Sequence, residues 1–254
     1  MKSKAYVLFF SSAFVLALLA GASVLSKDEP RNAEKGFALI ELYTSEGCSS
    51  CPSADALVAR VAKENANRAV YVLGYHVDYW NRLGWKDKFS RPEFSKRQRQ
   101  YAFTLKSQVY TPQIVVNGKS AFVGSDNRAL QKAIVSGLDA TPTRTLSLRY
   151  QPGKSNQAMI SYNVSGPAGN DILYLALVEK YAVTDVKQGE NSGRRLQHVN
   201  IVERLQAVPL NRQSGSVELS MPQVEPGNMQ VVGFVQEAST GEIKSAARCA
   251  FRVM

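Results

Sequence analysis

Apolar and polar positions follow one pattern in the first half of this chain and a different one in the second. Short apolar runs at 37–42 and 69–75 predict buried strands, and longer amphipathic runs at 53–62, 92–106 and 127–138 predict helices. Strands that are linked by helices normally pair in parallel. Residues 37–138 are therefore expected to form an α/β domain.

From residue 139 onward the pattern changes to short strands separated by turns. Apolar residues alternate with polar ones at 146–150 and 158–164, and apolar runs recur at 172–178, 217–219, 231–235 and 243–253. Proline and glycine pairs such as Pro152-Gly153 and Pro226-Gly227 stand between them. This arrangement is typical of a small antiparallel β-sandwich. We therefore predict a second domain at 139–254 with a sheet of its own.

The N-terminal residues are expected to direct export. Residues 1–4 are basic, residues 5–19 are mainly apolar, and Ala20-Gly21-Ala22 fits a cleavage site, so residues 1–22 are predicted to be a signal peptide. An uncleaved anchor is the alternative, because residues 5–26 carry no charge and about 20 apolar residues span a bilayer. Residues 23–36 would be a linker. We expect a periplasmic or extracellular protein that contacts a membrane only if this segment stays attached.

The chain of 254 residues has a formal net charge of +10. Its basic residues are spread out, with one local run at Lys96–Arg99 that is expected to face water. A basic protein can bind nucleic acid, but that class is recognised by a motif or a basic stripe, and no such motif is present. The charge therefore predicts a solvated surface and no nucleic-acid partner.

Only three cysteines are present, which is too few for a disulfide scaffold. Cys48 and Cys51 form a Cys-x-x-Cys pair between the first predicted strand and the first helix. A helix N-terminus carries partial positive charge that favours a thiolate, so Cys48 is predicted to be the nucleophile and Cys51 the more buried resolving cysteine. Two such cysteines are also half of a zinc site. Cys249 is predicted to be buried and unpaired in the last strand.

A second informative stretch lies at residues 109–124. Asn117-Gly118 between two apolar runs predicts a type I′ hairpin. Pro112 begins the first of these strands, where a proline lacks the N–H that a ladder needs, so a cis Thr111–Pro112 bond is expected.

Polar and aromatic residues follow the second predicted strand, at the sheet edge where Cys48 is also expected. His76 or Asp78 could therefore reach Cys48. A packed, hydrogen-bonded His76 is an equally good interpretation. Trp80 and Trp85 are expected in the core.

The order strand, Cys-x-x-Cys helix, strand, helix, Thr-Pro, hairpin, helix resembles the thioredoxin fold. Segments 41–52, 76–80 and 83–87 are more narrowly similar to the exported family catalogued as domain of unknown function 1223. The resemblance implies that residues 37–138 form a thioredoxin-like domain, with a cis-proline loop at Thr111–Pro112 that faces the cysteines; the predicted β-sandwich would follow it. It implies no substrate. Gly47 replaces the usual tryptophan, Ser49-Ser50 replaces Gly-Pro, and the usual strand acid is absent.

The resemblance and the motif together predict an exported thiol–disulfide oxidoreductase with Cys48, Cys51, Thr111 and Pro112 as site residues. It would need no cofactor, and its partners would be a thiol or disulfide client and a redox recycling partner. A thioredoxin-fold binding module with a structural disulfide is one alternative. A copper or zinc protein that uses Cys48, Cys51 and His76 is another. The loop at 189–194 is either a solvated hairpin loop or a segment that reaches back to the cysteines to help bind a client.

Overall fold

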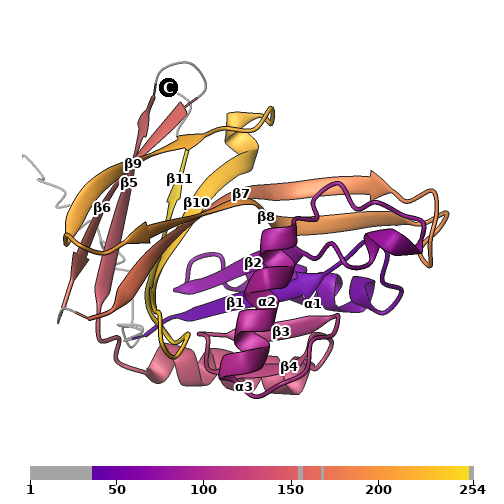
Figure 1. The fold of residues 1–254 in the computed structure, drawn as a ribbon, viewed down its shortest axis with the longest axis horizontal. Helices are drawn as coiled ribbons and strands as arrows, with labels where there is room; N and C mark the ends of the chain where they lie inside the picture. The colour runs from indigo at the N-terminus through magenta and orange to yellow at the C-terminus, as the bar shows by residue number, and fades with distance from the viewer. Residues whose placement is uncertain (1–35, 154–156, 167–168, 252–254) are drawn as a thin grey trace, which may run out of the picture. The chain divides into compact units, whose positions relative to one another are not determined.

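The structure is a computed structural model that describes residues 36–153, 157–166 and 169–251 (Figure 1). All of these residues belong to one compact unit, 34–254. The predicted signal peptide, residues 1–22, and residues 23–35 of the predicted linker lie outside the described residues. Within the described ranges, no helix is long and apolar enough to cross a membrane.

The first half of the chain forms the expected strands and helices. In order they are β1 (Ala38–Thr44), α1 (Cys51–Glu64), β2 (Val70–His76), α2 (Pro92–Thr104), β3 (Gln113–Val116), β4 (Ser120–Val123) and α3 (Asn127–Asp139). β1 pairs with β2 in parallel and with β3 in antiparallel fashion, and β4 pairs with β3. The strand order in this part of the sheet is therefore β2-β1-β3-β4.

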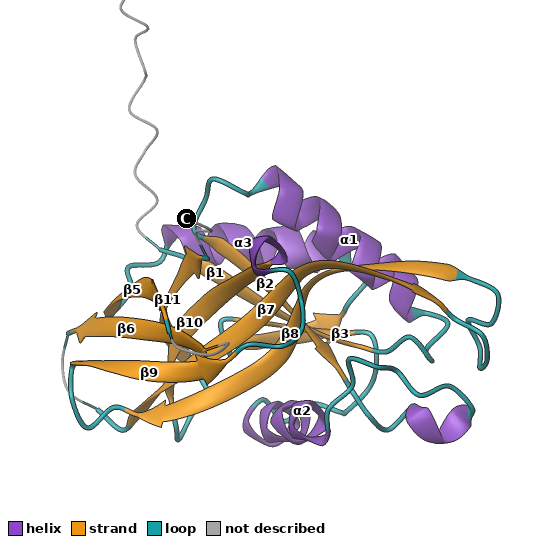
Figure 2. Cartoon of the chain, turned by 90° about the horizontal axis from the view of Figure 1, so that it is seen from above, coloured by secondary structure: helices purple, strands orange, loops and turns teal. Residues whose placement is uncertain are grey.

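Helices cover both faces of these strands. Successive side chains of a strand point to opposite faces, and all seven residues of β1 are buried. Leu39 and Tyr43 pack on one face in the same cluster as Phe94 and Tyr101 of α2. Ile40 and Leu42 pack on the other face against α1 and α3. Figure 2 shows α1 and α3 on one side of these strands and α2 on the other.

Both local predictions for residues 109–124 are confirmed. Asn117 and Gly118 have φ angles of 50° and 65°, the positive values that a type I′ turn needs. The Thr111–Pro112 peptide bond is cis. The Asn117 side chain also accepts from Leu39 N at 2.7 Å and donates to Phe37 O at 2.9 Å, so the turn is tied to the start of β1.

The second half consists mainly of strands, but most of them do not belong to a sheet of their own. The strands are β5 (Thr145–Pro152), β6 (Gln157–Ser165), β7 (Asp171–Asp185), β8 (Arg195–Pro209), β9 (Ser214–Ser220), β10 (Met229–Glu237) and β11 (Ile243–Ala250). Four of them extend the first-half sheet to eight strands, in the order β11-β10-β7-β8-β2-β1-β3-β4. Only β5, β6 and β9 form a separate three-stranded sheet. It packs on β7 and β10 through a shared apolar cluster, so a two-layer β packing is present.

The expectation of separate sheets failed because β8 was not predicted from the sequence. β8 pairs with β7 along its length and meets β2 at one bridge, Gly74 with Ile201. Its pairing with β7 skips a residue near Leu177, and Asn200 within it has a φ of 51°. Such irregularities change which face of the sheet the following side chains point to. The two-residue alternation that reveals a strand is therefore interrupted in the sequence of β8.

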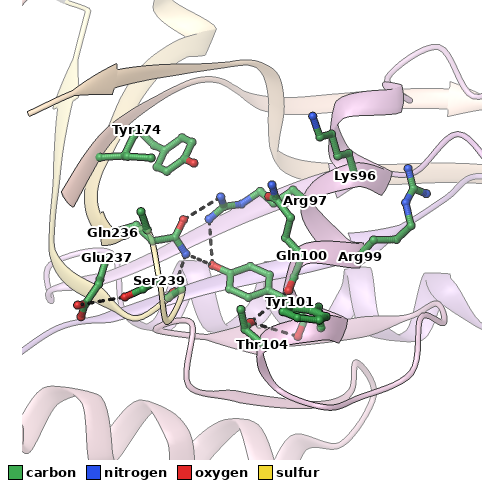
Figure 3. Close-up of a pocket in the computed structure, with 14 residues that line it drawn as sticks. Lys96, Arg97, Arg99, Gln100, Tyr101, Thr104, Tyr174, Gln236, Glu237 and Ser239 are labelled. Carbon is green, nitrogen blue, oxygen red and sulfur yellow. Dashed lines mark hydrogen bonds between the residues drawn. The ribbon is translucent and has the colours of Figure 1, made fainter. Parts of the chain in front are cut away.

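A buried ionic network lies where α2 meets the second-half strands (Figure 3). Arg97 Nε donates to Glu41 Oε1 at 2.6 Å, and its two other nitrogens donate to Gln236 and Tyr101. The guanidinium also lies 4.9 Å from the ring centre of Tyr174. A cavity of about 500 Å³ borders this network.

The location of this network corrects the expectation that the run Lys96–Arg99 faces water. Arg97 and Gln98 are buried, whereas Lys96 and Arg99 are exposed. The run lies within a helix, so its successive side chains point in different directions.

Candidate functional site

Cys48 and Cys51 are joined by a disulfide at the start of α1. Cys51 is the first residue of the helix, its backbone N–H donates to Cys48 O at 3.2 Å, and the two Cα atoms are 5.4 Å apart. Both cysteines have 0% exposed surface. The predicted difference in burial between them is therefore absent in this disulfide form.

The tip of the β7–β8 hairpin covers the cysteine motif. The buried Asn191 side chain donates from Nδ2 to Glu46 O and to Cys48 O, both at 2.9 Å. The neighbouring Glu190 carboxylate accepts from Ser49 N at 2.9 Å. Of the two interpretations of the 189–194 loop, the contacts agree with the one in which it reaches back to the cysteines. Its role in client binding stays a prediction.

Trp80 and Trp85 lie beside the cysteine motif. Trp80 packs against the apolar core from its edge, whereas Trp85 belongs to none of the apolar clusters of the described residues, which corrects the expectation that it lies in the core. Both are only partly buried. Trp85 Nε1 donates to Glu46 Oε2 at 2.7 Å, and Trp80 Nε1 donates to Thr111 Oγ1 at 2.8 Å. A Cβ on Gly47 would lie 3.3 Å from the Cβ of Trp80.

Trp80 thus links the residue before Cys48 to the cis-proline segment. The expectation that Pro112 contacts the cysteine pair itself stays a prediction.

Five titratable side chains gather beneath the cysteine motif. They are Glu46, Asp55, His76, Asp87 and His198, all 9% exposed or less. His76 Nδ1 and Asp87 Oδ2 are 2.6 Å apart, and the two histidine ring centres are 4.8 Å apart. Asp55 lies on α1, four residues after Cys51, and accepts from Thr44 Oγ1 at 3.1 Å. His76 therefore is a packed, hydrogen-bonded residue that also belongs to the site.

Burial and pairing shift the proton affinities of this cluster in different directions. Burial raises the pKa of Asp55 above its ordinary value, and the nearby His198 and His76 offset only part of the rise. Burial alone would lower the pKa of His76, but the charge and hydrogen bond of Asp87 raise it. Burial would raise the pKa of Asp87, but His76 holds it below its ordinary value. The His76–Asp87 pair is therefore favoured in its ionised form, and the Asp55 carboxyl binds a proton more readily than an ordinary carboxyl does.

Hydrogen bonding in this cluster is incomplete. Neither ring nitrogen of His198 has a hydrogen-bond partner among the described residues, and neither does Glu46 Oε1. His198 Nε2 and Glu46 Oε1 are 3.4 Å apart, within ion-pair range but too far for a well-formed hydrogen bond. Buried polar atoms without partners are costly, and where they persist a functional reason is often found.

Four members of this cluster were not predicted as site residues from the sequence: Glu46, Asp55, Asp87 and His198. Glu46 stands two residues before Cys48, and Asp55 is the one acid of α1 that lies on its buried side. Those positions were the available signals. Asp87 and His198 come from distant parts of the chain, and only the packing of β8 beside β2 brings His198 to His76.

Two other predicted residues lie apart from this chemistry. Asp78 accepts from Ser95 Oγ at 2.5 Å and is partly exposed, so its contacts lie on α2. Cys249 is unpaired, as predicted, but only partly buried. Burial raises the pKa of its thiol to about 11, so at neutral pH it carries almost no thiolate. Cys249 thus resembles a small apolar residue.

Among the described residues, no group of three or more His, Cys, Asp and Glu side chains is arranged to hold a metal ion. Cys48, Cys51 and His76, the alternative ligand set for copper or zinc, do not form such a group.

Comparison with known proteins places the chain in a family. The model of the family described as "Protein of unknown function (DUF1223)" matches residues 39–236, which include the cysteine pair, the Asn191 tip and His198. The chain belongs to this family. A crystal structure of an Agrobacterium tumefaciens protein is 27% identical with a TM-score of 0.65, and the match covers 88% of this chain and 99% of that one. The two chains therefore share a fold.

Other solved structures match only weakly. A domain of the outer membrane lipoprotein Omp28 from Porphyromonas gingivalis is 9% identical with a TM-score of 0.29, over 43% of this chain and 96% of that one. A β-glucuronidase from Ruminococcus gnavus is 12% identical with a TM-score of 0.26, over 45% of this chain and 17% of that one. A comparison with curated proteins finds no match.

Proposed function

We propose that this DUF1223 protein is an exported thiol–disulfide oxidoreductase built on a thioredoxin-like domain. The observation that carries the proposal is a Cys-x-x-Cys pair at the start of α1, flanked in the chain by Glu46 and Asp55, which belong to a buried cluster of titratable groups. The strand order β2-β1-β3-β4 and the cis Thr111–Pro112 bond support the resemblance to the thioredoxin fold. Cys48, Cys51, Thr111 and Pro112 are the proposed site residues.

The proposed reaction is reversible exchange. A client thiolate attacks Cys48 Sγ, the client–Cys48 S–S bond forms, and the Cys48–Cys51 bond breaks with its electron pair on Cys51 Sγ. A second client thiolate then attacks the client sulfur of this mixed disulfide and releases Cys48 as a thiolate. The client pair is oxidised to a disulfide, and the protein pair is reduced. The redox recycling partner reverses the change on the protein.

Asp55 is placed to handle the proton of the Cys51 thiol. It follows Cys51 by four residues on α1, so the two side chains lie on the same face of the helix. Because burial raises the pKa of the Asp55 carboxyl, this group keeps its proton to a higher pH than an ordinary carboxyl does, and it can donate that proton to the Cys51 thiolate as the thiolate leaves. The reverse reaction returns the proton to Asp55.

Exchange requires the hairpin tip to move. Both cysteines are fully buried, and Asn191 and Glu190 are hydrogen-bonded to backbone atoms on either side of Cys48. Breaking these three hydrogen bonds exposes the motif without disturbing the sheet. The tip would then open for a client and close over the disulfide.

Covalent trapping tests the proposal. The reduced Cys51→Ala variant lacks the resolving thiol, so its Cys48 thiolate should attack client disulfides, release one client sulfur as a thiolate and accumulate mixed disulfides. Cys48→Ala should accumulate none. The adducts are detected by non-reducing electrophoresis and mass spectrometry after incubation with exported proteins. If Cys51→Ala captures no more protein than Cys48→Ala does, the oxidoreductase proposal is wrong.

The second candidate is a binding module with a structural disulfide. The complete burial of Cys48 and Cys51 favours it, because a bond that no thiol reaches is protected from exchange. In that case the disulfide would resist dithiothreitol until the protein unfolds. An oxidoreductase would instead be reduced while it remains folded, so reduction kinetics measured alongside circular dichroism separate the two candidates.

A further inference from the structure

A groove beside the cysteine pair runs between α1 and β8. Its cavity volume is about 260 Å³. Pro52, Asp55 and Ala59 line it from the helix, and Arg195 and Gln197 line it from the strand. Pro52 directly follows Cys51 in the chain, so one end of the groove wall is the residue next to the disulfide. An extended segment bound there would hold its own cysteine near Cys48.

The groove is positively charged. Arg194 and Arg195 are both exposed and both line it. The Arg195 side chain forms no ion pair or hydrogen bond with any described residue. Asp55 is the one acid among the lining residues, so two arginines face a single carboxyl. The net field in the groove therefore attracts anions.

The cysteine motif already binds a carboxylate from the chain itself. Glu190 is exposed, yet its carboxylate accepts from Ser49 N, inside the Cys-x-x-Cys motif. The pKa of Glu190 lies below its ordinary value because the Ser49 hydroxyl and backbone N–H both donate to the carboxylate. The backbone beside Cys48 thus accommodates a carboxylate, and Glu190 occupies the place where a client carboxylate would compete.

We infer that the clients of this protein are cysteine-containing peptides with acidic residues beside the cysteine. One client carboxylate displaces Glu190 from Ser49 N, and a second pairs with Arg194 and Arg195 in the groove. The client thiolate then attacks Cys48 Sγ in the exchange described above. This inference rests on the proposed function and specifies its substrate class.

Recognition of an acidic client is also coupled to opening of the hairpin tip. Arg194 Nη1 donates to Asn191 Oδ1 at 2.8 Å, and Nδ2 of the same Asn191 side chain holds the carbonyls of Cys48 and Glu46. A client carboxylate that pairs with Arg194 competes with Asn191 for the guanidinium. Displacement of Glu190 removes the other contact of the tip. Acidic clients therefore loosen the hydrogen bonds that keep the disulfide covered.

Rates of exchange with matched peptides test the inference. Two reduced peptides are compared that differ only in having Glu or Gln on both sides of one cysteine. Each is mixed with the oxidised wild-type protein, the reaction is quenched with acid, and the second-order rate constant for loss of the protein disulfide is measured. The rate of each peptide with a small aromatic disulfide corrects for its intrinsic thiol reactivity. Glutathione, which has two carboxylates, tests whether a small anionic thiol suffices.

Variants locate the preference in the groove. Wild type should react about five- to tenfold faster with the acidic peptide, the effect of one or two partly exposed ion pairs. Arg195→Gln should lose most of this preference, and Glu190→Gln should increase the rate with the acidic peptide by removing the competing charge. The matched control Arg128→Gln/Lys132→Gln removes two exposed charges from α3 and should keep the preference.

The outcomes distinguish a failure of the acidic-client preference from a failure of the proposed oxidoreductase activity. Equal corrected rates for the two peptides in wild type, or an unchanged preference in Arg195→Gln, overturn the inference and leave the oxidoreductase in place. A preference for glutathione equal to that for the acidic peptide supports the inference and identifies small anionic thiols as sufficient. Failure of every thiol to reduce the folded wild-type protein overturns both the function and the inference.

Discussion

Two buried ionic clusters join the halves of this protein, and they differ in how completely their polar atoms are paired. In the cluster at α2, each side-chain nitrogen and oxygen of Glu41, Arg97, Tyr101 and Gln236 has a hydrogen-bond partner, so its charged groups are fully paired. The hydroxyls of the adjoining Tyr43 and Tyr75 have none among the described residues. In the cluster beneath the cysteines, both ring nitrogens of His198 and one oxygen of Glu46 have none among the described residues.

The difference teaches which cluster holds the fold together and which is available for chemistry. A saturated network in a low-dielectric interior rigidifies its surroundings, because any change leaves a charge unpaired. In a network with unpaired atoms, a side chain can gain or lose a proton without breaking a full set of hydrogen bonds. We therefore assign structure to the Glu41–Arg97 cluster and proton handling to the His76–His198 cluster.

The largest expected effect comes from breaking the saturated cluster. Arg97→Met leaves the Glu41 carboxylate buried without its cation and should lower the free energy of unfolding by about 3–5 kcal/mol. Denaturant unfolding followed by circular dichroism measures it. Arg99→Met on the exposed side of α2 is the matched control and should change stability by less than about 0.5 kcal/mol. A small effect of Arg97→Met would show that the two clusters do not differ as described.

The next effect concerns the hairpin tip over the other cluster. Asn191→Ala leaves the buried carbonyls of Glu46 and Cys48 without this donor, which should cost about 1–3 kcal/mol of stability. By removing the cover, it should also speed reduction of the folded disulfide by dithiothreitol about tenfold or more. Gln188→Ala, an exposed neighbour in the same loop, serves as the control. An unchanged reduction rate in Asn191→Ala would exclude the tip as the barrier to exchange.

Removing Asp87 tests the role of the unsaturated cluster through pH. The ordinary His76 pKa is 6.5, and Asp87 raises it in the folded protein, where burial alone would lower it. The stabilisation from this shift is fully present below pH 6.5 and is lost as pH rises through the folded-state pKa. The free energy of unfolding of the oxidised wild type should therefore decline over that window. Asp87→Asn should abolish this decline, as measured by denaturant unfolding at a series of pH values. If both proteins have the same slope, His76 is not held in its charged form by Asp87.

Cys249 provides the smallest expected effect. Cys249→Ala removes a partly buried sulfur from the apolar cluster and should cost about 1 kcal/mol or less. It should leave the rate of thiol–disulfide exchange unchanged. With a thiol pKa of about 11, native Cys249 should react slowly with iodoacetamide at neutral pH. Fast alkylation would show that the third thiol is available for chemistry.

The sequence revealed the parts of the fold that are encoded locally. The Asn117-Gly118 turn, the cis bond before Pro112 and the helix after Cys51 each depend on the conformational preferences of a few neighbouring residues, and all were predicted. The arrangement of the second half was not, because β8 has irregular pairing and its place beside β2 depends on contacts far apart in the chain.

The site was predictable to the same degree. Cys48 and Cys51 were found from their spacing, whereas Asp87 and His198 carry no local signal of their role. The segment 96–99 has the composition of a surface run, but Arg97 lies inward because Glu41 and Gln236 provide partners for it. Pairing of this kind becomes visible only after the fold brings the partners together.

The reduction potential of the Cys48–Cys51 pair tests the central claim most directly. The folded protein is equilibrated with dithiothreitol or glutathione buffers, its thiols are trapped by alkylation, and the oxidised fraction is measured by mass spectrometry. A redox-active pair predicts a potential between about −120 and −270 mV, the range of known exchange proteins. A potential below about −300 mV would mark a structural disulfide and would contradict the account.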